Sequence, residues 1–308
     1  MCARPMAPLH PQARAVLDAI AQAEGGDEVR DIAELRRLEK LEQRFAGEPQ
    51  PVGSVHDIAV PGPERPLLVR MYEPAGAAAR STVLFIHGGG WALGSVELSD
   101  HVCRALCRAS LMRVASIDYR LAPEHRFPAA VDDVFAALAW LAERPETFGG
   151  LAVCGDSAGG NLAAAVALMA RDRGLDGLLL QVLIYPALDP TLSERSYATL
   201  AEGYGLTRAD MRLFWDAYLR STSDGRNPYA APSVAADLRN VAPALVITAE
   251  FDPLVDEGER YARRLAEAGV KVELRRFEGM IHGFVGYLGA VDDAQVAIDE
   301  CAAALRSC

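Results

Sequence analysis

The sequence predicts an α/β protein with a mostly parallel central sheet that carries helices on both faces. From about residue 52 to the end, strand-like and helix-like segments alternate, and this alternation is typical of such a sheet. A chain of 308 residues with 51% hydrophobic content can also bury a large core. In addition, two short glycine-rich segments each directly follow an apolar, strand-like run, so we expect the functional groups at the ends of those strands.

The first glycine-rich segment, HGGG at residues 87–90, follows the apolar run at residues 83–86. Glycines let backbone N–H groups approach a ligand closely, and in hydrolases of the α/β class a loop of this type supplies donors to an oxyanion hole. The alternative is an ordinary glycine-rich turn. The second segment favours the hydrolase interpretation.

That second segment, GDSAGG at residues 155–160, places a serine on a strand-to-helix turn. Residues 151–154 are an apolar run of strand type and residues 161–170 are strongly helical, so Ser157 lies between them. Such a turn forces the serine into a strained conformation that only small flanking residues accommodate. It also puts Ser157 at a helix N-terminus, whose free N–H groups favour negative charge, and Ala158 N–H is the expected donor there.

A nucleophilic serine needs a base, and the base needs an orienting acid. In this class the chain order is serine, then an acid, then histidine. His282 is the only histidine after Ser157, and it follows the strand-like residues 271–277. Asp252 lies just past the buried-strand pattern of residues 244–249 and precedes a proline, so we expect it to be the acid.

Two other acidic residues lie near Asp252. Glu250 is the weaker alternative for the orienting acid, because it lies closer to the strand itself. Asp256 is expected to cap a helix over residues 257–268.

Together these motifs resemble the hormone-sensitive-lipase-like family of carboxylesterases, the bacterial family IV esterases. The likeness covers nearly the whole chain, and its matching stretches are HGGGW at 87–91, DYRLAPE at 118–124, GDSAGG at 155–160, YP at 185–186, DPLVDEG at 252–258 and HGF at 282–284. The resemblance implies an α/β-hydrolase fold in which Gly88 and Gly89 donate N–H groups to the oxyanion beside Ala158. It also implies that residues 118–124 brace the loop that starts at His87.

Two regions carry helical patterns without strands. In the N-terminal stretch up to about residue 48, apolar side chains recur at helical spacing while charged ones face away; the apolar set is Val29, Ile32, Leu35, Leu38, Leu41 and Phe45, and the charged set is Arg36, Arg37, Lys40 and Glu42. Residues 192–224 are also predicted to be helical, with Thr207 as an N-cap before Met211, Phe214, Trp215 and Tyr218.

In the family that the chain resembles, such regions pair as a helical cap above the active site. We therefore expect a catalytic domain of residues 49–187 and 227–308 and a cap of residues 1–48 and 188–226. The alternative is ordinary surface helices packed on the sheet. Under a cap, the expected substrate pocket is lined by Trp91, Asp156, Leu206, Phe214, Ile281 and Phe284.

Composition excludes several classes of function. The net charge of −11 argues against binding to nucleic acid or to anionic membranes. No apolar run approaches the ~20 residues of a spanning helix, and the N-terminus has no signal-peptide pattern, so we expect a cytoplasmic protein. The six cysteines form no C-x-x-C pair and H-E-x-x-H is absent, so we expect no metal. Residues 203–205 lack the third glycine of a dinucleotide fingerprint, and no cofactor is expected.

The expected reaction is two-step acyl transfer on a small-molecule ester, with a preference for acyl chains of about two to eight carbons. Two alternatives stay open. The same triad serves amidases and lactonases, and a ligand receptor can use this scaffold without catalysis, although the presence of His282 counts against a receptor. The family resemblance also leads us to expect a possible homodimer.

Overall fold

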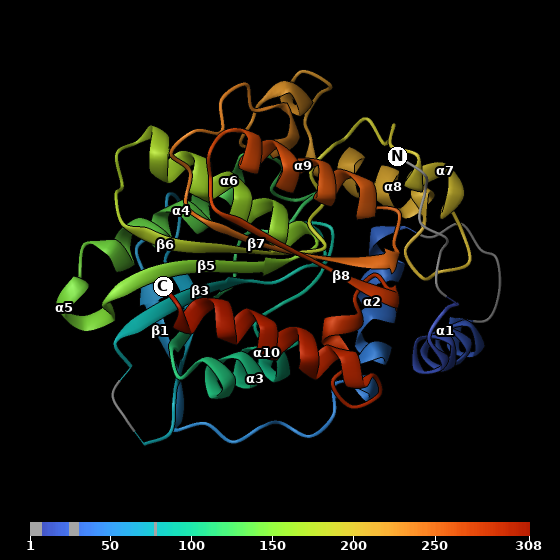
Figure 1. Cartoon of the computed structure of the whole chain (residues 1–308), viewed down its shortest axis with the longest axis horizontal. Coiled ribbons are helices and arrows are strands. Elements are labelled where there is room, and N and C mark those ends of the chain that lie inside the picture. The colour runs from blue at the N-terminus through green and yellow to red at the C-terminus, as the bar shows by residue number, and fades with distance from the viewer. Residues whose placement is uncertain (1–7, 25–30, 77–78) are drawn as a thin grey trace.

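The computed structural model describes residues 8–24, 31–76 and 79–308. Its centre is an eight-stranded sheet in the order β1-β2-β4-β3-β5-β6-β7-β8 (Figure 1). The strands are β1 Ser54–Val60, β2 Leu67–Glu73, β3 Ser81–Ile86, β4 Arg113–Ile117, β5 Gly150–Asp156, β6 Leu178–Ile184, β7 Ala244–Phe251 and β8 Val272–Ile281.

The sheet is parallel from β4 to β8 and antiparallel at the β1–β2–β4 edge. The central strands are covered on both faces, and β7 is buried along its whole length. This burial explains why these strands are nearly continuous apolar runs in the sequence instead of alternating patterns. The predicted fold class is confirmed.

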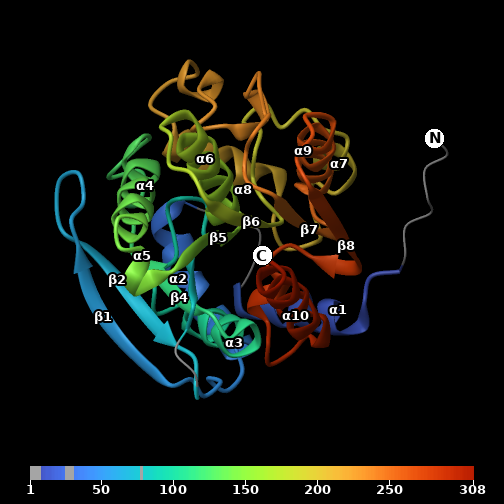
Figure 2. The same cartoon turned by 60° about the vertical axis from the view of Figure 1, so that its left-hand side comes forward.

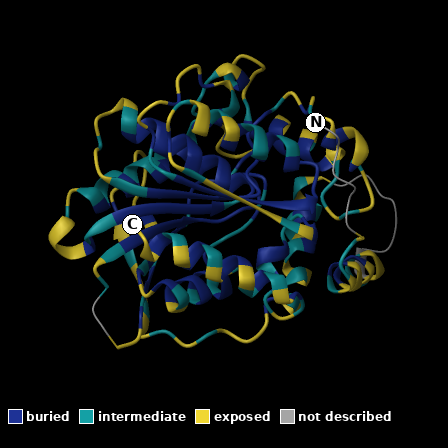
Figure 3. Cartoon of the chain, viewed as in Figure 1, coloured by how far each residue is buried: buried dark blue, intermediate teal, exposed yellow. Residues whose placement is uncertain are grey.

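Helices cover both faces of the sheet. Figures 1 and 2 show α3 and α10 on one face and α4, α6 and α9 on the other, and Figure 3 shows the buried residues concentrated in the strands and on the inner sides of these helices. The helices are α1 Pro11–Glu24, α2 Ile32–Glu42, α3 Asp100–Ser110, α4 Ala129–Ala142, α5 Pro145–Phe148, α6 Ala158–Asp172, α7 Ser196–Thr199, α8 Arg208–Tyr218, α9 Val255–Glu267 and α10 Asp292–Arg306, with short 3₁₀ turns at Gln43–Phe45, Asp224–Arg226, Pro232–Val234 and Phe284–Gly286.

Helices α1, α2, α7 and α8 gather at the end of the molecule to which the central strands point (Figure 1). Thr207 caps α8 as predicted: its hydroxyl accepts the N–H of Asp210, and the Asp210 carboxylate accepts the N–H of Thr207. The prediction of one helical stretch over residues 192–224 is wrong, because α7 and α8 are separated by a loop. Gly203 and Gly205 in that loop both have a φ of 88°, which a right-handed helix does not allow.

The predicted faces of α2 are partly wrong. Leu35 and Leu38 are buried, but Leu41 is 42% exposed, and Arg36 turns inward to bond the carbonyls of Ala92 and Ala122. The inward face of α2 is centred on residues 35, 38, 39 and 42, and positions 36 and 41 lie on its opposite flanks. Val29 lies outside the described residues.

Five cysteines in the described part of the chain are free, and Cys103 and Cys107, both on α3, are fully buried. Cys2 is not among the described residues. In the described part of the chain, no helix is both long and apolar enough to cross a bilayer.

Candidate active site

Ser157 lies on the turn between β5 and α6, in a conformation that the surrounding backbone imposes. Its φ is 55° and its ψ is −117°, outside the regions that L-residues prefer. Its N–H donates to the carbonyl of Ile184 at 2.8 Å, which ties the turn to the neighbouring strand β6. A Cβ at Gly159 would lie 1.9 Å from the carbonyl oxygen of Ile86, so the chain needs glycine there. The small flanking residues predicted from the sequence therefore have a steric reason.

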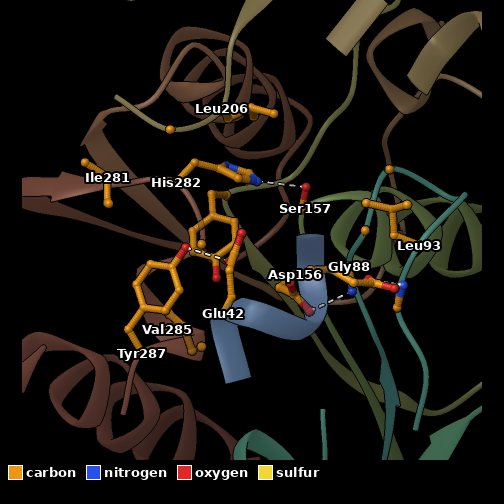
Figure 4. Close-up of a pocket in the computed structure, with 18 of the residues that line it drawn as sticks. Glu42, Gly88, Leu93, Asp156, Ser157, Leu206, Ile281, His282, Val285 and Tyr287 are labelled. Carbon is orange, nitrogen blue, oxygen red and sulfur yellow. Dashed lines mark hydrogen bonds between the residues drawn. The ribbon is translucent and has the colours of Figure 1, made fainter. Parts of the chain in front are cut away.

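His282 lies between Ser157 and Asp252, and Figure 4 shows its hydrogen bond to Ser157. Its Nε2 is 2.9 Å from Ser157 Oγ, and its Nδ1 is 2.7 Å from Asp252 Oδ2. Asp252 is fully buried, and its other carboxylate oxygen accepts the N–H of Leu254 at 2.8 Å. Because an ionised carboxylate only accepts, the proton on His282 sits on Nδ1 and leaves Nε2 free to accept one from the serine.

The two other acidic residues have different partners. Glu250 is still part of β7, and its carboxylate accepts the N–H of Gly279 at 2.8 Å. The expectation that Asp256 caps the following helix is wrong, because α9 starts one residue before it and Asp256 instead accepts the N–H of Ser196. The chain turns into α9 earlier than predicted because the carbonyl of Asp252 already accepts the N–H of Val255.

The loop after β3 carries backbone donors to the same place. Gly88 is the exception: its N–H donates to Asp156 Oδ1 at 2.9 Å, so the expectation that Gly88 serves an oxyanion is wrong. Among the described residues, the N–H groups of Gly89, Gly90 and Ala158 have no acceptor. Sequence reasoning did not name Gly90 as a candidate donor, and the available signal that Gly88 N–H is already bonded was Asp156, the acid of the GDSAGG motif.

Asp156 combines burial with this bond to the loop. Burial raises its pKa to about 6, and the His282 ring and the Gly88 N–H oppose that rise. The carboxylate therefore titrates at mildly acidic pH, where most aspartates are already ionised.

His87 is a structural residue of the loop. Burial lowers its pKa to about 4, so the ring is neutral at pH 7. Its ring stacks on Tyr119 with centroids 4.3 Å apart, the Tyr119 hydroxyl donates to the His87 carbonyl at 2.9 Å, and Ala122 N–H donates to the Trp91 carbonyl. Residues 118–124 thus brace the loop, as the resemblance implied.

A cavity of about 660 Å³ opens at Ser157 and His282. Of the predicted pocket residues, Asp156, Leu206, Phe214 and Ile281 line it. Sequence reasoning placed the N-terminal stretch in a cap above the site but named none of its lining residues, which include Leu17, Leu35, Leu38, Glu39 and Glu42. In the described part of the chain, no three His, Cys, Asp or Glu side chains are placed to hold a metal ion.

Trp91 and Phe284 do not line the cavity, which corrects two predictions. Trp91 is fully buried and stacks on Tyr218, with ring centroids 4.4 Å apart and planes at 4°. Phe284 is also fully buried and packs on Phe277 and Tyr185. Both side chains follow a functional motif in sequence but point into the core behind it.

A family model described as alpha/beta hydrolase fold matches residues 83–286. The chain belongs to this family. It is 42% identical over 269 residues to the carboxylic ester hydrolase LipN of Mycobacterium tuberculosis, an alignment that covers 84% of this chain and 72% of the relative. It is 40% identical to an arylesterase of Saccharolobus solfataricus, over 77% and 78% of the two chains.

Solved structures agree with these relatives. A hyperthermophilic esterase from the archaeon Pyrobaculum calidifontis superposes with a TM-score of 0.90 at 41% identity, over 98% of this chain and 99% of that one. The ester hydrolase EH1AB1 from the Lake Arreo metagenome gives 0.91 at 40% identity, over 97% and 98%. Within the α/β-hydrolases, the chain is a member of the hormone-sensitive-lipase-like family IV.

Proposed function

We propose that this protein is a serine carboxylesterase that hydrolyses short- to medium-chain acyl esters through Ser157, His282 and Asp252. That it is a carboxylic ester hydrolase follows from its family and from relatives about 40% identical to it over most of the chain. The observation that carries the finer proposal is the unbroken hydrogen-bonded chain from Asp252 Oδ2 through the His282 ring to Ser157 Oγ, at 2.7 and 2.9 Å.

The proposed reaction has two steps. Ser157 Oγ attacks the ester carbonyl carbon while His282 Nε2 takes the hydroxyl proton; the tetrahedral intermediate then collapses, and the alcohol leaves with that proton. A water molecule next attacks the acyl-enzyme, again through His282, and releases the carboxylic acid and the free serine. In both steps Asp252 holds the proton on Nδ1 and stabilises the imidazolium that forms.

We assign the oxyanion donors to the N–H groups of Gly89, Gly90 and Ala158. Ala158 opens α6, so its N–H adds the helix N-terminus to the site. The carbonyl of Gly89 accepts the N–H groups of Ala92 and Leu93 at 3.0 and 2.8 Å. Because N–H and C=O of a trans peptide point in opposite directions, this bonding turns the Gly90 N–H away from the 92–93 turn.

The cavity supports a small, soluble ester as substrate. Its volume of about 660 Å³ is that of a typical small-molecule site. We propose that α1, α2, α7 and α8, from residues 1–48 and 188–226, form a cap, with residues 49–187 and 227–308 as the catalytic domain. Phe214 on α8 then ends the acyl pocket, and chains of about two to eight carbons fit. A homodimer stays a prediction for size measurements in solution.

Labelling with a fluorophosphonate, followed by a substrate panel, tests the proposal. We expect stoichiometric labelling of Ser157 in the parent, no labelling of Ser157→Ala, and turnover of p-nitrophenyl butyrate that falls by about 10⁴-fold or more in Ser157→Ala and in His282→Ala. The panel pairs each ester with the matching amide and lactone. Activity of Ser157→Ala within about tenfold of the parent, or faster cleavage of amides or lactones than of esters, contradicts the proposal.

A further inference from the structure

Helix α2, far from the triad in sequence, bonds directly to the backbone of the loop that carries the oxyanion donors. Arg36 Nε donates to the carbonyl of Ala92 at 2.8 Å, and Glu39 Oε2 accepts the N–H of Gly94 at 2.8 Å. One helical turn thus holds both ends of the 92–94 turn, one through a donor and one through an acceptor.

The same guanidinium also reaches the segment that braces the loop. Arg36 Nη2 donates to the carbonyl of Ala122 at 2.9 Å, and Nη1 and Nη2 donate to the two carboxylate oxygens of Glu124 at 2.7 and 2.8 Å. Ala122 in turn donates its N–H to the carbonyl of Trp91. Only the planar fork of arginine serves these three acceptors at once, because a lysine ammonium is a single point on a flexible stem.

The 92–94 turn transmits this position to the donors. The N–H groups of Ala92 and Leu93 hold the carbonyl of Gly89, which fixes the plane of the peptide that also contains the Gly90 N–H. On the other side, Gly94 packs so closely on the start of the loop that a Cβ there would lie 2.3 Å from His87 Nδ1 and 2.6 Å from the Gly88 carbonyl. A shift of the turn therefore moves the whole loop.

We propose that Arg36 and Glu39 are positioning residues for the hydrolysis, because they set the peptide plane that presents the Gly90 N–H to the oxyanion. The inference rests on the proposed function. Neither side chain contacts the reacting atoms in this proposal. Both act through their hydrogen bonds to the 92–94 turn. Helix α2 therefore both positions an oxyanion donor and lines the cavity.

Substitutions of Arg36 and of Glu39 remove different hydrogen bonds to the 92–94 turn. Arg36→Lys keeps the charge but loses the fork, so we expect kcat to fall roughly 10- to 100-fold while KM stays within about threefold. Glu39→Met removes the acceptor for Gly94, whereas Glu39→Gln keeps a carbonyl oxygen in that place. We expect Glu39→Met to lose roughly tenfold in kcat and Glu39→Gln to stay within about threefold of the parent.

Neighbouring residues on α2 provide matched controls. Arg37 is exposed and pairs only with Glu34 among the described residues, and Lys40 is exposed as well. Arg37→Lys repeats the Arg36→Lys change, and Lys40→Met replaces another charged side chain by methionine, both on the outer face of α2. We expect both to keep kcat within about twofold.

The experiment measures kcat per labelled serine and the inhibition constant of a trifluoromethyl ketone, which adds Ser157 Oγ to its carbonyl and forms an oxyanion in the proposed position. Counting sites by fluorophosphonate labelling removes any effect of unfolded protein. We expect the inhibition constant of Arg36→Lys to rise by the same factor as kcat/KM falls, while substrate binding to the same variant in a Ser157→Ala background is unchanged.

Three outcomes overturn the inference. One is a kcat of Arg36→Lys within about twofold of the parent; another is equal loss in Arg37→Lys; the third is a fall in kcat with no weakening of the ketone. Failure of the proposed function gives a different result: Ser157→Ala stays active and no serine is labelled, whatever the α2 variants do.

Discussion

The turn around Ser157 and the loop at residues 87–94, which we propose to supply the nucleophile and the oxyanion donors, meet at the same site but are held by different parts of the molecule. The turn around Ser157 is enclosed by backbone: the carbonyls of Ile86 and His87 leave no room for a Cβ at Gly159, and Ser157 N–H bonds to Ile184. The loop at residues 87–94 is held largely by side chains, from Asp156, Tyr119, Arg36 and Glu39. The turn is therefore fixed by neighbouring strands, and the loop by contacts from distant segments.

This difference has a physical basis. Where backbone packs closely around a glycine, no side chain can move to make room, so a substitution there disturbs the fold itself. Side-chain hydrogen bonds are removable one at a time, at modest cost in stability, while the geometry that they impose stays decisive for the reaction. We expect substitutions at the turn to cost folding and substitutions at the loop to cost rate.

The largest effect should come from the acid behind the turn. Asp252→Asn leaves the shape intact but favours the wrong tautomer of His282, and we expect kcat to fall by about 10⁴-fold. Asp256→Asn should keep most activity, because an amide oxygen can still accept the N–H of Ser196. Steady-state kinetics of the two purified variants check this, and the reverse ranking would mean that Asp252 is not the orienting acid.

A rescue experiment tests whether the turn around Ser157 and the loop at residues 87–94 respond differently to substitution. A Cβ at Gly90 would lie 2.3 Å from the ring of Phe214, so Gly90→Ala should lose roughly 100-fold in kcat. Adding Phe214→Ala removes this clash and should recover part of the loss on p-nitrophenyl acetate, while the strain of an alanine at the Gly90 φ of 58° remains. In Gly159→Ala the Cβ would lie 1.9 Å from the Ile86 carbonyl oxygen, and we expect no second substitution to restore folding.

Circular dichroism and kinetics of the parent and of these three variants make the check. If Gly159→Ala folds normally, or if Phe214→Ala leaves the Gly90→Ala defect unchanged, the contrast between the two regions is wrong.

Asp156 joins the two regions and gives a pH-dependent effect on stability. Because burial raises its pKa from 3.8 to about 6, the folded state binds a proton more tightly than the unfolded state does. The parent should therefore lose stability as pH rises through that window, by up to about 3 kcal/mol. Asp156→Asn cannot titrate, yet its amide oxygen still accepts the Gly88 N–H.

Urea unfolding at pH 4 and pH 8 tests this prediction. We expect Asp156→Asn to gain about 1 to 3 kcal/mol relative to the parent between the two pH values. The matched control is Asp176→Asn, since Asp176 is exposed on the surface. An equal change in both variants would show that the carboxylate of Asp156 is not the source.

The smallest effect concerns substrate length. If Phe214 ends the acyl pocket, each methylene that fits adds about 0.8 kcal/mol, so kcat/KM should rise about fourfold per carbon before the wall is met. Phe214→Ala should move the optimum toward longer chains by a few carbons. A series of p-nitrophenyl esters from acetate to decanoate measures the shift, and an unchanged profile would place the wall elsewhere.

The sequence by itself determined the fold class and the order of the reacting groups. Buried parallel strands need continuous apolar runs, and the turn around Ser157 needs small residues, so both leave local patterns. The brace from residues 118–124 also followed, through the family resemblance. These features depend on residues that are close together in the chain, so local sequence patterns reveal them.

Only the tertiary structure decided which groups are free and which are already bonded. The sequence does not show that Gly88 N–H is taken by Asp156, that Trp91 and Phe284 turn into the core, or that Arg36 reaches Ala92 across 56 positions. Each of these facts depends on contacts between segments that are distant in sequence. A local pattern records the preference of a residue for a helix, a turn or a buried position, but the partner that it meets there is fixed only when the strands and helices pack.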